Sequence, residues 1–541
     1  MIKRLMGRSW SSGELIVAVA VFVALFCNVG YFKSAANAVG TSGSNLMFLG
    51  SLFLQMVTLF ILVLSAICHR YLIKPILIAF LVLSSGLTYF TTKYGTIFDF
   101  QMISNILETD SAEVGDVLST QLGIYVLLLG LLPSLAIWRA KLVHPHWKTE
   151  TVARIKLIAT AAAIMLLSYL PFSANQASLG REHRDVTSKV IPTYAAYSTF
   201  KLASRSMKFR EREHVIVGGD AKVRAGDPHR QLIVMVVGET VRADHWGLNG
   251  YARDTTPLLR GHGVINFPDF WSCDTSTAKS VPCMFSNLGR AKFDRNEAAR
   301  RDNALDVLAR AGVDVLWRDN NSSSKGVADR VTYQDFKGPD LNPICENGEC
   351  RDEGMLHGLQ EYIDAKKGDI LIVLHQMGNH GPAYYKRYPK TFERFTPVCR
   401  TNDLGSCSEG EIKNAYDNAV LYTDYFLSKV IELLKQNEDR FETAMFYLSD
   451  HGESLGEYGM YLHATPYLIA PDAQKHIPAV IWMGSAVEHD INIGAIDARR
   501  QRPWSHDNVF STLLGFFEIA SNVYVPDMDL LQRAETKVSS P

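Results

Sequence analysis

The first third of the chain contains five apolar runs, each long enough to cross a membrane as a helix. A hydrocarbon core about 30 Å thick requires about 20 residues in helical conformation. The first run is too long for the apolar part of a removable signal peptide, and no convincing small-residue cleavage site follows it. It is therefore more consistent with a retained membrane anchor. We place the five spans at residues 13–32, 46–68, 74–92, 119–138 and 156–173.

Lysine and arginine residues indicate how these spans are oriented. They cluster before the first span, between the second and third, and between the fourth and fifth. Loops rich in these residues stay on the cytoplasmic side of a membrane. The N-terminus is therefore predicted inside, and an odd number of spans carries everything after about residue 174 to the outside. The basic residues are Lys3, Arg4, Arg8, Arg70, Lys74, Arg139, Lys141, Lys148, Arg154 and Lys156.

The pattern changes after the transmembrane domain, which we assign to residues 1–173. Residues 174–230 are polar and mixed, which predicts a bridging surface helix followed by a linker. From residue 231 to 541, apolar strand-like runs alternate with helical patterns. This alternation predicts an exported α/β domain with a central, mostly parallel sheet. The strand-like runs are QLIVMVVG, VDVLW, DILIVLH, TAMFYLS and IPAVIWM.

Composition and cysteine content agree with two different halves. The average composition, 47% hydrophobic with a net charge of -1, describes neither half. The exported part has no basic stripe of the kind that binds nucleic acid. Six of the eight cysteines form three close sequence pairs there, as disulfides outside a membrane would. Nearest-neighbour pairing rests on proximity alone, and a metal site is less favoured because no C-x-x-C spacing occurs. The pairs are Cys273 and Cys283, Cys345 and Cys350, and Cys399 and Cys407.

Metal-binding residue types follow three of the predicted strands. Glu239 follows the first run, the stretch from His375 to His380 follows the third, and Asp450 and His451 follow the fourth. In parallel sheets, ligands gather beyond the carboxyl ends of the strands. Carboxylate and imidazole groups bind catalytic zinc. An acidic residue alone at such a position more often caps a helix, so the metal site is predicted from the combination.

A short stretch rich in hydroxyl groups, SCDTSTAKSVPCMFS, covers Ser272 to Ser286. If its two cysteines are joined, the disulfide holds a loop of about ten residues still, as a nucleophilic alcohol requires. An alcohol bound to a metal loses its proton far more readily than a free one. Spacing alone leaves open which alcohol reacts: Thr275, Ser276, Thr277 or Ser280.

Several motifs together resemble a known family. They are VVGETVRADHWGLNGYARDTTP, CDTSTAKSVPCMFS, RDNNSSSKGVADR, HQMGNHGPAYYKRYP, SDHGESLGEYGMYLHATPY and SHDN. With these the chain resembles, over essentially its whole length, the phosphoethanolamine transferases that modify lipid A, a group that includes the mobile colistin-resistance enzymes. The resemblance implies an alkaline-phosphatase-like (sulfatase-like) α/β/α domain in the periplasm. It also implies five helices in the inner membrane of a Gram-negative bacterium, and we expect a monomer.

The resemblance also implies a zinc ion bound by Glu239, Thr277, Asp450 and His451, with Thr277 as the nucleophile. Thr277 would attack the phosphorus of phosphatidylethanolamine and release diacylglycerol. A lipid A phosphate would then take the phosphoethanolamine group. Because this lowers the negative charge of the lipid, resistance to polymyxin and colistin is expected. The implied disulfides are Cys273–Cys283, Cys345–Cys350 and Cys399–Cys407.

Further residues match family positions around the phosphate. These are Asn321, Lys325, His380 and His463, with Glu453 as an acidic group close to the zinc. Either histidine could donate a proton to the leaving group or hold a second zinc. Without the family, Lys325 would be read as an exposed turn lysine. His375 has no role in this scheme, and His506 and Asp507 are either indirect supports of the metal or a helix cap.

The outside loop 93–118 has helical periodicity, which by itself predicts an amphipathic connector. By resemblance, Asn105, Thr109 and Glu113 form the ethanolamine-binding face of this loop, and Ser322 completes it. Residues four apart share one face of a helix, so the spacing is consistent. One departure concerns the hydroxyl loop, because this chain has Asp274 where many relatives have glycine. The pattern offers no reason for it.

Other functions compatible with the same fold stay open at this stage. A sulfatase would need a C/S-x-P-x-R motif, which is missing, and a lipoteichoic acid synthase fits the three cysteine pairs poorly. A phosphodiesterase hydrolase would pass the group to water, and a related transferase would use a Kdo or heptose acceptor. A binding protein that had lost catalysis would be expected to lack one or more of the metal ligands. This chain retains all four, Glu239, Thr277, Asp450 and His451.

Overall fold

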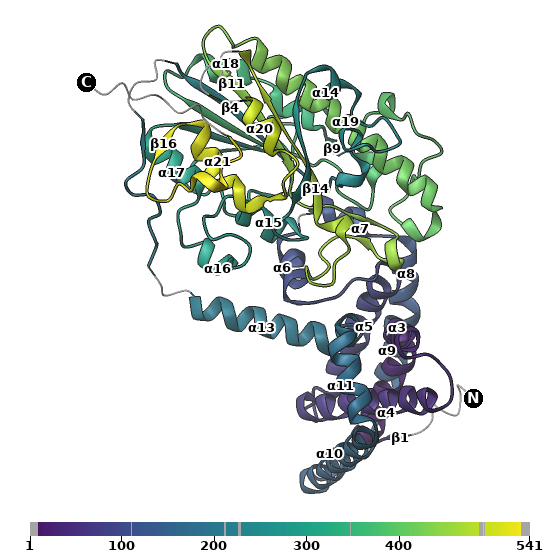
Figure 1. Cartoon of the computed structure of the whole chain (residues 1–541). Helices are drawn as coiled ribbons and strands as arrows, with labels where there is room; N and C mark the ends of the chain where they lie inside the picture. Colours follow the sequence, from purple (N-terminus) through teal and green to yellow (C-terminus); the bar gives the residue numbers. More distant parts are fainter. Residues whose placement is uncertain are drawn as a thin grey trace. The chain divides into compact units, whose positions relative to one another are not determined.

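The computed structural model describes residues 9–109, 111–209, 213–224, 229–346, 348–485, 491 and 493–531. The chain forms two compact units (Figure 1). The first consists of Met1–Ile103 and Leu118–Ala203, and the second of Ser104–Val117 and Ser204–Pro541. The short segment Ser104–Val117 therefore groups with the large C-terminal part of the chain, although it lies between two apolar helices in the sequence.

Among its described residues, the first unit contains four helices long and apolar enough to cross a membrane, and a fifth candidate that is bent. The four are Asn45–Ile67, Ile73–Tyr94, Thr120–Arg139 and Trp147–Phe172. As elements they are α4 (Ser44–Ile67), α5 (Ile73–Tyr94), the continuous run α8 (Thr120–Tyr125), η2 (Val126–Leu131) and α9 (Leu132–Arg139), and α10 (Trp147–Tyr169) with η3 (Leu170–Phe172). The last one begins earlier than the predicted residue 156, because its polar first turns are helical as well.

The fifth candidate is a bent pair, in which Ser12–Cys27 and Val29–Val39 meet at 59°. The break falls at Asn28, just after the π-helical turn η1 (Val23–Cys27). The Asn28 amide donates to the carbonyl of Val23 at 3.1 Å and to that of Ile191 at 2.9 Å. A side chain that inserts into the helical ladder is a common cause of a kink. The predicted span 13–32 therefore runs through a bend that its apolar pattern does not show. The two helices are α2 (Ser12–Phe22) and α3 (Val29–Val39).

Residues 174–230 contain more helix than the single bridging helix expected from the sequence. Their described parts include α11 (Ser173–Glu182), α12 (Arg184–Thr187) and α13 (Thr193–Phe209). The loop after α5 forms α6 (Phe100–Glu108) and α7 (Ser111–Val117).

The second unit is built on a sheet of eight strands in the order β15-β5-β14-β11-β4-β10-β6-β7. The five apolar runs predicted as strands are β4, β6, β10, β11 and β14, which confirms the α/β class. Within this sheet, among the described residues, only β14 pairs antiparallel, with β11 and β5. The strands are β4 (Gln231–Gly238), β5 (Ile265–Trp271), β6 (Asp314–Asp319), β7 (Thr332–Asp335), β10 (Ile370–His375), β11 (Glu442–Ser449), β14 (His476–Met483) and β15 (Trp504–Ser505).

Helices cover the sheet, so its central strands are buried along their whole length. This is why they are continuous apolar runs instead of alternating ones. Figure 1 shows α19 (Glu409–Lys435) on one side of the sheet and α17 (Ala304–Ala311) and α21 (Val509–Phe516) on the other. Residues 233, 235 and 237 of β4 belong to the same core cluster as α17 and α21, as the two-residue period of a strand requires.

The remaining elements are short. They include α14 (Pro257–Gly261), α15 (Thr277–Met284), α16 (Arg295–Ala298), α18 (Leu359–Asp364) and α20 (Ile493–Arg499). Small two-stranded sheets pair β1 (Ser9–Trp10) with β2 (Lys141–Leu142), β3 (Lys222–Val223) with β16 (Ile519–Ala520), β8 (Cys345–Glu346) with β9 (Glu349–Cys350), and β12 (Ser454–Leu455) with β13 (Tyr461–Leu462). Disulfides join all three expected cysteine pairs.

The register of the parallel strands places four strand ends at one edge of the sheet. Gly238 at the end of β4 lies opposite Ser449 at the end of β11, and Val237 lies opposite His375 of β10. His375 in turn lies opposite Asp319 of β6. The residues that follow these strands consequently gather at the same edge, where ligands bind in sheets of this kind.

Candidate active site

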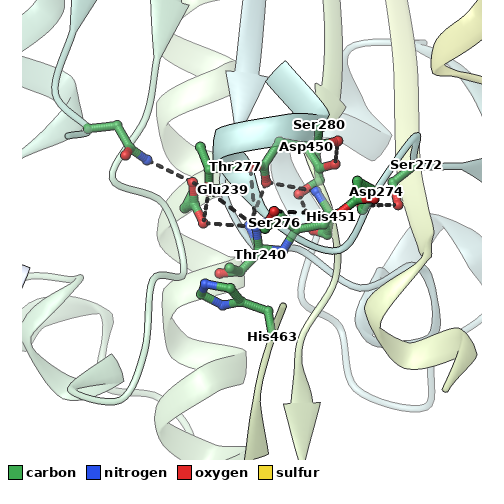
Figure 2. A network of polar contacts seen from close by, with 12 residues as sticks. Glu239, Thr240, Ser272, Asp274, Ser276, Thr277, Ser280, Asp450, His451 and His463 are labelled. Carbon is green, nitrogen blue, oxygen red and sulfur yellow. Dashed lines mark hydrogen bonds and ion pairs between the residues drawn. The ribbon is translucent and has the colours of Figure 1, made fainter. Parts of the chain in front are cut away.

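Four side chains meet at that edge of the sheet (Figure 2). Glu239 follows β4, Asp450 and His451 follow β11, and Thr277 is the first residue of α15. One ligand atom from each of Glu239, Asp450 and His451 lies within 4.8 Å of the others, and all three side chains are buried. These are the residues that the sequence predicted as metal ligands.

The distances within this cluster fit a tetrahedral metal ion. Thr277 Oγ1 lies 3.2 Å from Glu239 Oε2 and 3.2 Å from His451 Nε2. His451 Nε2 lies 3.3 Å from Asp450 Oδ2 and 3.6 Å from Glu239 Oε1. Ligand atoms around a tetrahedral zinc ion are about 3.3 Å apart when each bond is about 2.0 to 2.1 Å long.

Charge supports the same interpretation. Asp450 Oδ2 is buried and accepts no hydrogen bond from any described residue. Burial raises the pKa of Asp450, because a carboxylate is costly to keep charged away from water. A cluster of two buried carboxylates needs positive charge, and a divalent cation between Glu239 and Asp450 would supply it.

The protein also fixes the protonation of His451. Its Nδ1 donates a hydrogen bond to the carbonyl of Gly452 at 2.8 Å, so the lone pair of Nε2 faces the cluster. Burial, with a smaller effect from His463, lowers the pKa of His451 to about 3. The imidazole is therefore neutral at physiological pH, as a metal ligand must be.

Of the four alcohols between Cys273 and Cys283, Thr277 is the one whose hydroxyl contacts the side chains of this cluster among the described residues. The Thr275 hydroxyl donates to the carbonyl of Thr465, and the Ser280 hydroxyl donates to the carbonyl of Asp450. Ser276 is the N-cap of α15 and contacts Asp274. Thr277 stands at the positive end of α15, where a phosphate group is favoured.

The loop is held from behind by a disulfide and by His506. The Cys273–Cys283 bond closes it, and the amide of Cys273 donates to His506 Nδ1 at 3.0 Å. His506 Nε2 donates to the carbonyl of Ser449, at the end of β11, also at 3.0 Å. His506 therefore links the hydroxyl loop to the strand that carries Asp450, and burial lowers its pKa to about 4. Asp507 instead accepts a hydrogen bond from the amide of Arg290.

The structure supplies the reason for Asp274 that the sequence did not. This carboxylate is only 1% exposed, and its Oδ2 lies 2.7 Å from Nζ of Lys279, two residues beyond Thr277. The ion pair therefore joins the turn before Thr277 to the first turn of α15. A buried carboxylate with its own counter-ion is tolerated, whereas an unpaired one is not.

A second group of polar residues lies beside the cluster. Asn321 Nδ2 donates to Glu239 Oε2 at 2.8 Å, and Nζ of Lys325 donates to the hydroxyl of Ser322 at 2.5 Å. Ser322 in turn bonds to the Asn321 side chain, so these three residues form one chain of contacts that begins at Glu239. Lys325 has a backbone φ of +53°, which is rare outside glycine and often marks functional sites.

Two histidines close the other side of the site. The ring of His463 lies 4.5 Å from that of His451 and 5.5 Å from that of His380. His463 Nδ1 donates to Glu453 Oε2 at 2.8 Å, which fixes the orientation of the ring. Burial, followed by nearby positive charges, holds the pKa of His380 well below its usual range.

Two residues of this region were not singled out from the sequence. The Tyr384 hydroxyl donates to Glu453 Oε1 at 2.7 Å and so completes the support of His463. Gly381 leaves room for the same carboxylate, because a Cβ there would lie 2.7 Å from Glu453 Oε1. Both lie in the motif HGPAYYKRYP, whose histidine was the only residue assigned a role. His375 lies in the sheet core, where its Nδ1 contacts Asp319 at 3.1 Å.

The expected ethanolamine site is only partly described. The Thr109 hydroxyl donates to the carbonyl of Asn105, and the amide oxygen of Asn105 is buried without a hydrogen bond from any described residue. Within the described part of the chain, no hydrogen bond or ion pair joins either residue to the Thr277 cluster. The side chain of Glu113 lies outside the described residues.

Comparison with known proteins gives consistent matches. Residues 56–207 match the family "Phosphoethanolamine transferase EptA/EptB", and residues 231–519 match the sulfatase family. The chain is 41% identical over 529 residues to phosphatidylethanolamine transferase Mcr-1 of Escherichia coli, covering 95% of this chain and 96% of that protein. It is 35% identical over 542 residues to phosphoethanolamine transferase EptA of Escherichia coli strain K12, covering 98% and 99%.

Solved structures agree with these matches. The integral membrane lipooligosaccharide phosphoethanolamine transferase A (EptA) of Neisseria meningitidis superposes with a TM-score of 0.93 at 35% identity, covering 97% of this chain and 99% of that one. The separately solved soluble domain of the Neisseria enzyme is 44% identical, with a TM-score of 0.58 over 59% of this chain. The likeness therefore extends over both the apolar helices and the sheet domain.

The geometry predicts that the purified protein holds about one tightly bound divalent ion, in a tetrahedral site. Replacing Glu239→Gln, Asp450→Asn or His451→Ala should each lower the bound metal strongly, because each removes one of the few ligands. Glu457→Gln is a matched control, since Glu457 pairs with Arg242 at 2.6 Å outside the cluster. The metal content of each protein, measured after gel filtration by elemental mass spectrometry, tests this prediction. Equal metal in all four variants and the wild type would contradict the assignment.

Proposed function

The chain belongs to the phosphoethanolamine transferase family, and from this premise we propose that it moves phosphoethanolamine from phosphatidylethanolamine to a phosphate group of lipid A. The observation that carries the proposal is the position of Thr277, whose hydroxyl lies within 3.2 Å of both Glu239 and His451. This places one alcohol, at a helix N-terminus, among the ligands of a predicted metal ion.

The proposed setting is the inner membrane of a Gram-negative bacterium, with the sheet domain in the periplasm and the protein acting as a monomer. The candidate spans and the basic loops support this orientation. The three disulfides of the second unit support it too, because such bonds persist outside the cytoplasm. The proposed domains are residues 1–173, 174–230 and 231–541.

The metal of this proposal is zinc, held by Glu239, Thr277, Asp450 and His451. Nitrogen and carboxylate ligands with an oxygen in the remaining position are typical of catalytic zinc. When bound there, zinc would lower the proton affinity of the Thr277 hydroxyl and offset the negative charge of the phosphate.

In the first half of the reaction, Thr277 Oγ1 attacks the phosphorus of phosphatidylethanolamine. The Thr277 hydroxyl donates to Glu239 Oε2, so this carboxylate is placed to receive the proton. The bond from phosphorus to the diacylglycerol oxygen breaks, and either His380 or His463, which must first be protonated, supplies a proton to that oxygen. Diacylglycerol leaves, and phosphoethanolamine remains on Thr277.

In the second half, a phosphate oxygen of lipid A attacks the same phosphorus and the bond from phosphorus to Thr277 Oγ1 breaks. Glu239 returns the proton to Thr277 Oγ1, and the proton of the attacking lipid A phosphate reloads the histidine. Phosphoryl transfer depends mainly on positioning and on charge around the phosphoryl oxygens. Asn321 and Lys325 are proposed to hold those oxygens, and Glu453 to keep His463 in place. Asn105, Thr109, Glu113 and Ser322 are proposed to bind the ethanolamine group, with Glu113 facing the ammonium.

Lipid A mass spectra from cells that express the chain provide the direct test. The wild type should add phosphoethanolamine to lipid A and raise polymyxin resistance, and Thr277→Ala should abolish both while the protein still folds. Ser276→Ala is the matched control, because among the described residues this neighbouring alcohol bonds to Asp274 and not to the side chains of the cluster. This variant should retain transfer within a fewfold.

The location of the added group separates the alternatives. Phosphoethanolamine found on a Kdo or heptose residue would show that this sugar, and not a lipid A phosphate, is the acceptor. Free phosphoethanolamine without modified lipid would identify a hydrolase. An unchanged lipid A spectrum with folded, metal-containing protein would contradict the transferase proposal, and activity in Thr277→Ala would show that another alcohol attacks.

The disulfides allow a second test, because two of them close loops of similar length. Cys273–Cys283 and Cys399–Cys407 have sequence separations of 10 and 8. Removing either pair by Cys→Ser should lower the unfolding free energy by about 2 to 3 kcal/mol on the chain-entropy model. Only loss of the first should also strongly reduce transfer by the folded protein, since it frees the Thr277 loop. If the two double variants transferred equally well at equal amounts of folded protein, the Cys273–Cys283 disulfide would have no special role in holding the Thr277 loop.

A further inference from the structure

A buried group of charges joins the segment Ser104–Val117 to the loop that carries His380. Asp116, near the end of this segment, is only 4% exposed. Its Oδ1 lies 2.5 Å from Nζ of Lys386, and its Oδ2 forms an ion pair with Nη2 of Arg387. Both partners follow His380 closely in sequence. All of these residues belong to the second compact unit.

Arg387 connects this carboxylate to the backbone of the active site. Its Nε donates to the carbonyl of His380 at 2.7 Å, and its Nη1 donates to Glu349 Oε2 at 2.6 Å. The Arg387 side chain is 3% exposed. The guanidinium is planar and rigid, so its three nitrogens keep a fixed angular relation. A shift at Asp116 would therefore be transmitted to the peptide of His380.

We propose that Asp116 is a positioning residue for His380, and that it couples the docking of the segment Ser104–Val117 to the alignment of this histidine. The inference rests on the proposed function, in which this segment binds the ethanolamine of the donor and His380 serves the transfer. Docking of the donor-binding segment would then complete the His380 side of the site.

The surroundings explain why a small movement matters. His380 is followed by Gly381, where there is no free space beside Glu453 Oε1. Glu453 in turn orients His463, whose ring lies 5.5 Å from that of His380. In this proposal, loss of Asp116 leaves Glu349 to hold Arg387, so the guanidinium turns toward Glu349 and releases the His380 carbonyl. Misplacing a catalytic group by about 1 Å can cost on the order of 100-fold in rate.

Lys386 provides a control built into the chain. It binds the same Asp116 carboxylate, but its side chain is 34% exposed and it is not the residue that bonds to the His380 carbonyl. If Asp116 only fastened the segment, loss of Lys386 and loss of Arg387 would have similar effects. If Asp116 acts on His380, the effects differ.

The experiment uses the full-length protein in detergent with fluorescent phosphatidylethanolamine as donor and lipid A as acceptor. Asp116→Asn and Arg387→Lys should lower kcat by on the order of 10- to 100-fold, with the KM for the donor changed less than about threefold. Lys386→Gln should stay within about threefold of the wild type, and Asp116→Glu should recover part of the lost kcat.

A double-mutant cycle separates positioning from folding. Asp116→Asn should cause little further loss in a His380→Ala background, because both changes remove the same contribution. The proposal would be overturned if the losses of activity caused by Asp116→Asn and His380→Ala multiplied in the double variant. It would also be overturned if Lys386→Gln lowered kcat as much as Arg387→Lys. If Asp116→Asn does not fold, the comparison of Arg387→Lys with Lys386→Gln decides in the same way.

One readout does not depend on the proposed function. Hydrogen exchange of the peptide that contains His380 should accelerate in Asp116→Asn and Arg387→Lys and remain as in the wild type in Lys386→Gln. Unchanged exchange in all three variants would contradict the coupling. Absence of transfer by the wild type, with the expected exchange pattern, would instead contradict the proposed function and leave the coupling supported.

Discussion

The site depends on one electrostatic constraint, the burial of Glu239 and Asp450 side by side at the edge of the sheet. Two carboxylates without water or counter-charge are strongly unfavourable there. His451, kept neutral with its Nε2 toward them, adds a ligand but no charge. Thr277 stands 3.2 Å from Glu239 and from His451. A divalent cation would resolve the constraint, and Thr277, the alcohol that it is proposed to activate, is already in place.

The rest of the second unit holds these groups in position. The parallel register of β4 and β11 brings Glu239 and Asp450 together from strands separated by about two-fifths of the chain. The disulfide Cys273–Cys283 and His506 fix the loop of Thr277 against the end of β11. Tyr384 and Glu453 fix His463. Each of these proposed catalytic groups is thus supported by a second residue, which is how precise placement is obtained in active sites.

The parts of the structure that depend on local sequence pattern were predictable from the sequence. The central strands were predictable because strands buried on both faces are continuous apolar runs, and Glu239, Asp450 and His451 because they follow such runs directly. Contacts between distant residues were not predictable. The bend at Asn28 depends on the carbonyl of Ile191, and the role of His506 depends on Cys273 and Ser449. Asp274 could be explained only once Lys279 was seen beside it.

The central claim is that Thr277 carries the phosphoethanolamine group between donor and acceptor. The direct measurement is mass spectrometry of the peptide containing Thr277, after incubation of the wild-type protein with phosphatidylethanolamine and no acceptor. We predict that this peptide gains the mass of one phosphoethanolamine group, that fragmentation locates it on Thr277, and that addition of lipid A removes it. An unmodified Thr277 peptide under conditions where lipid A becomes modified, or a group located on another residue, would contradict the account.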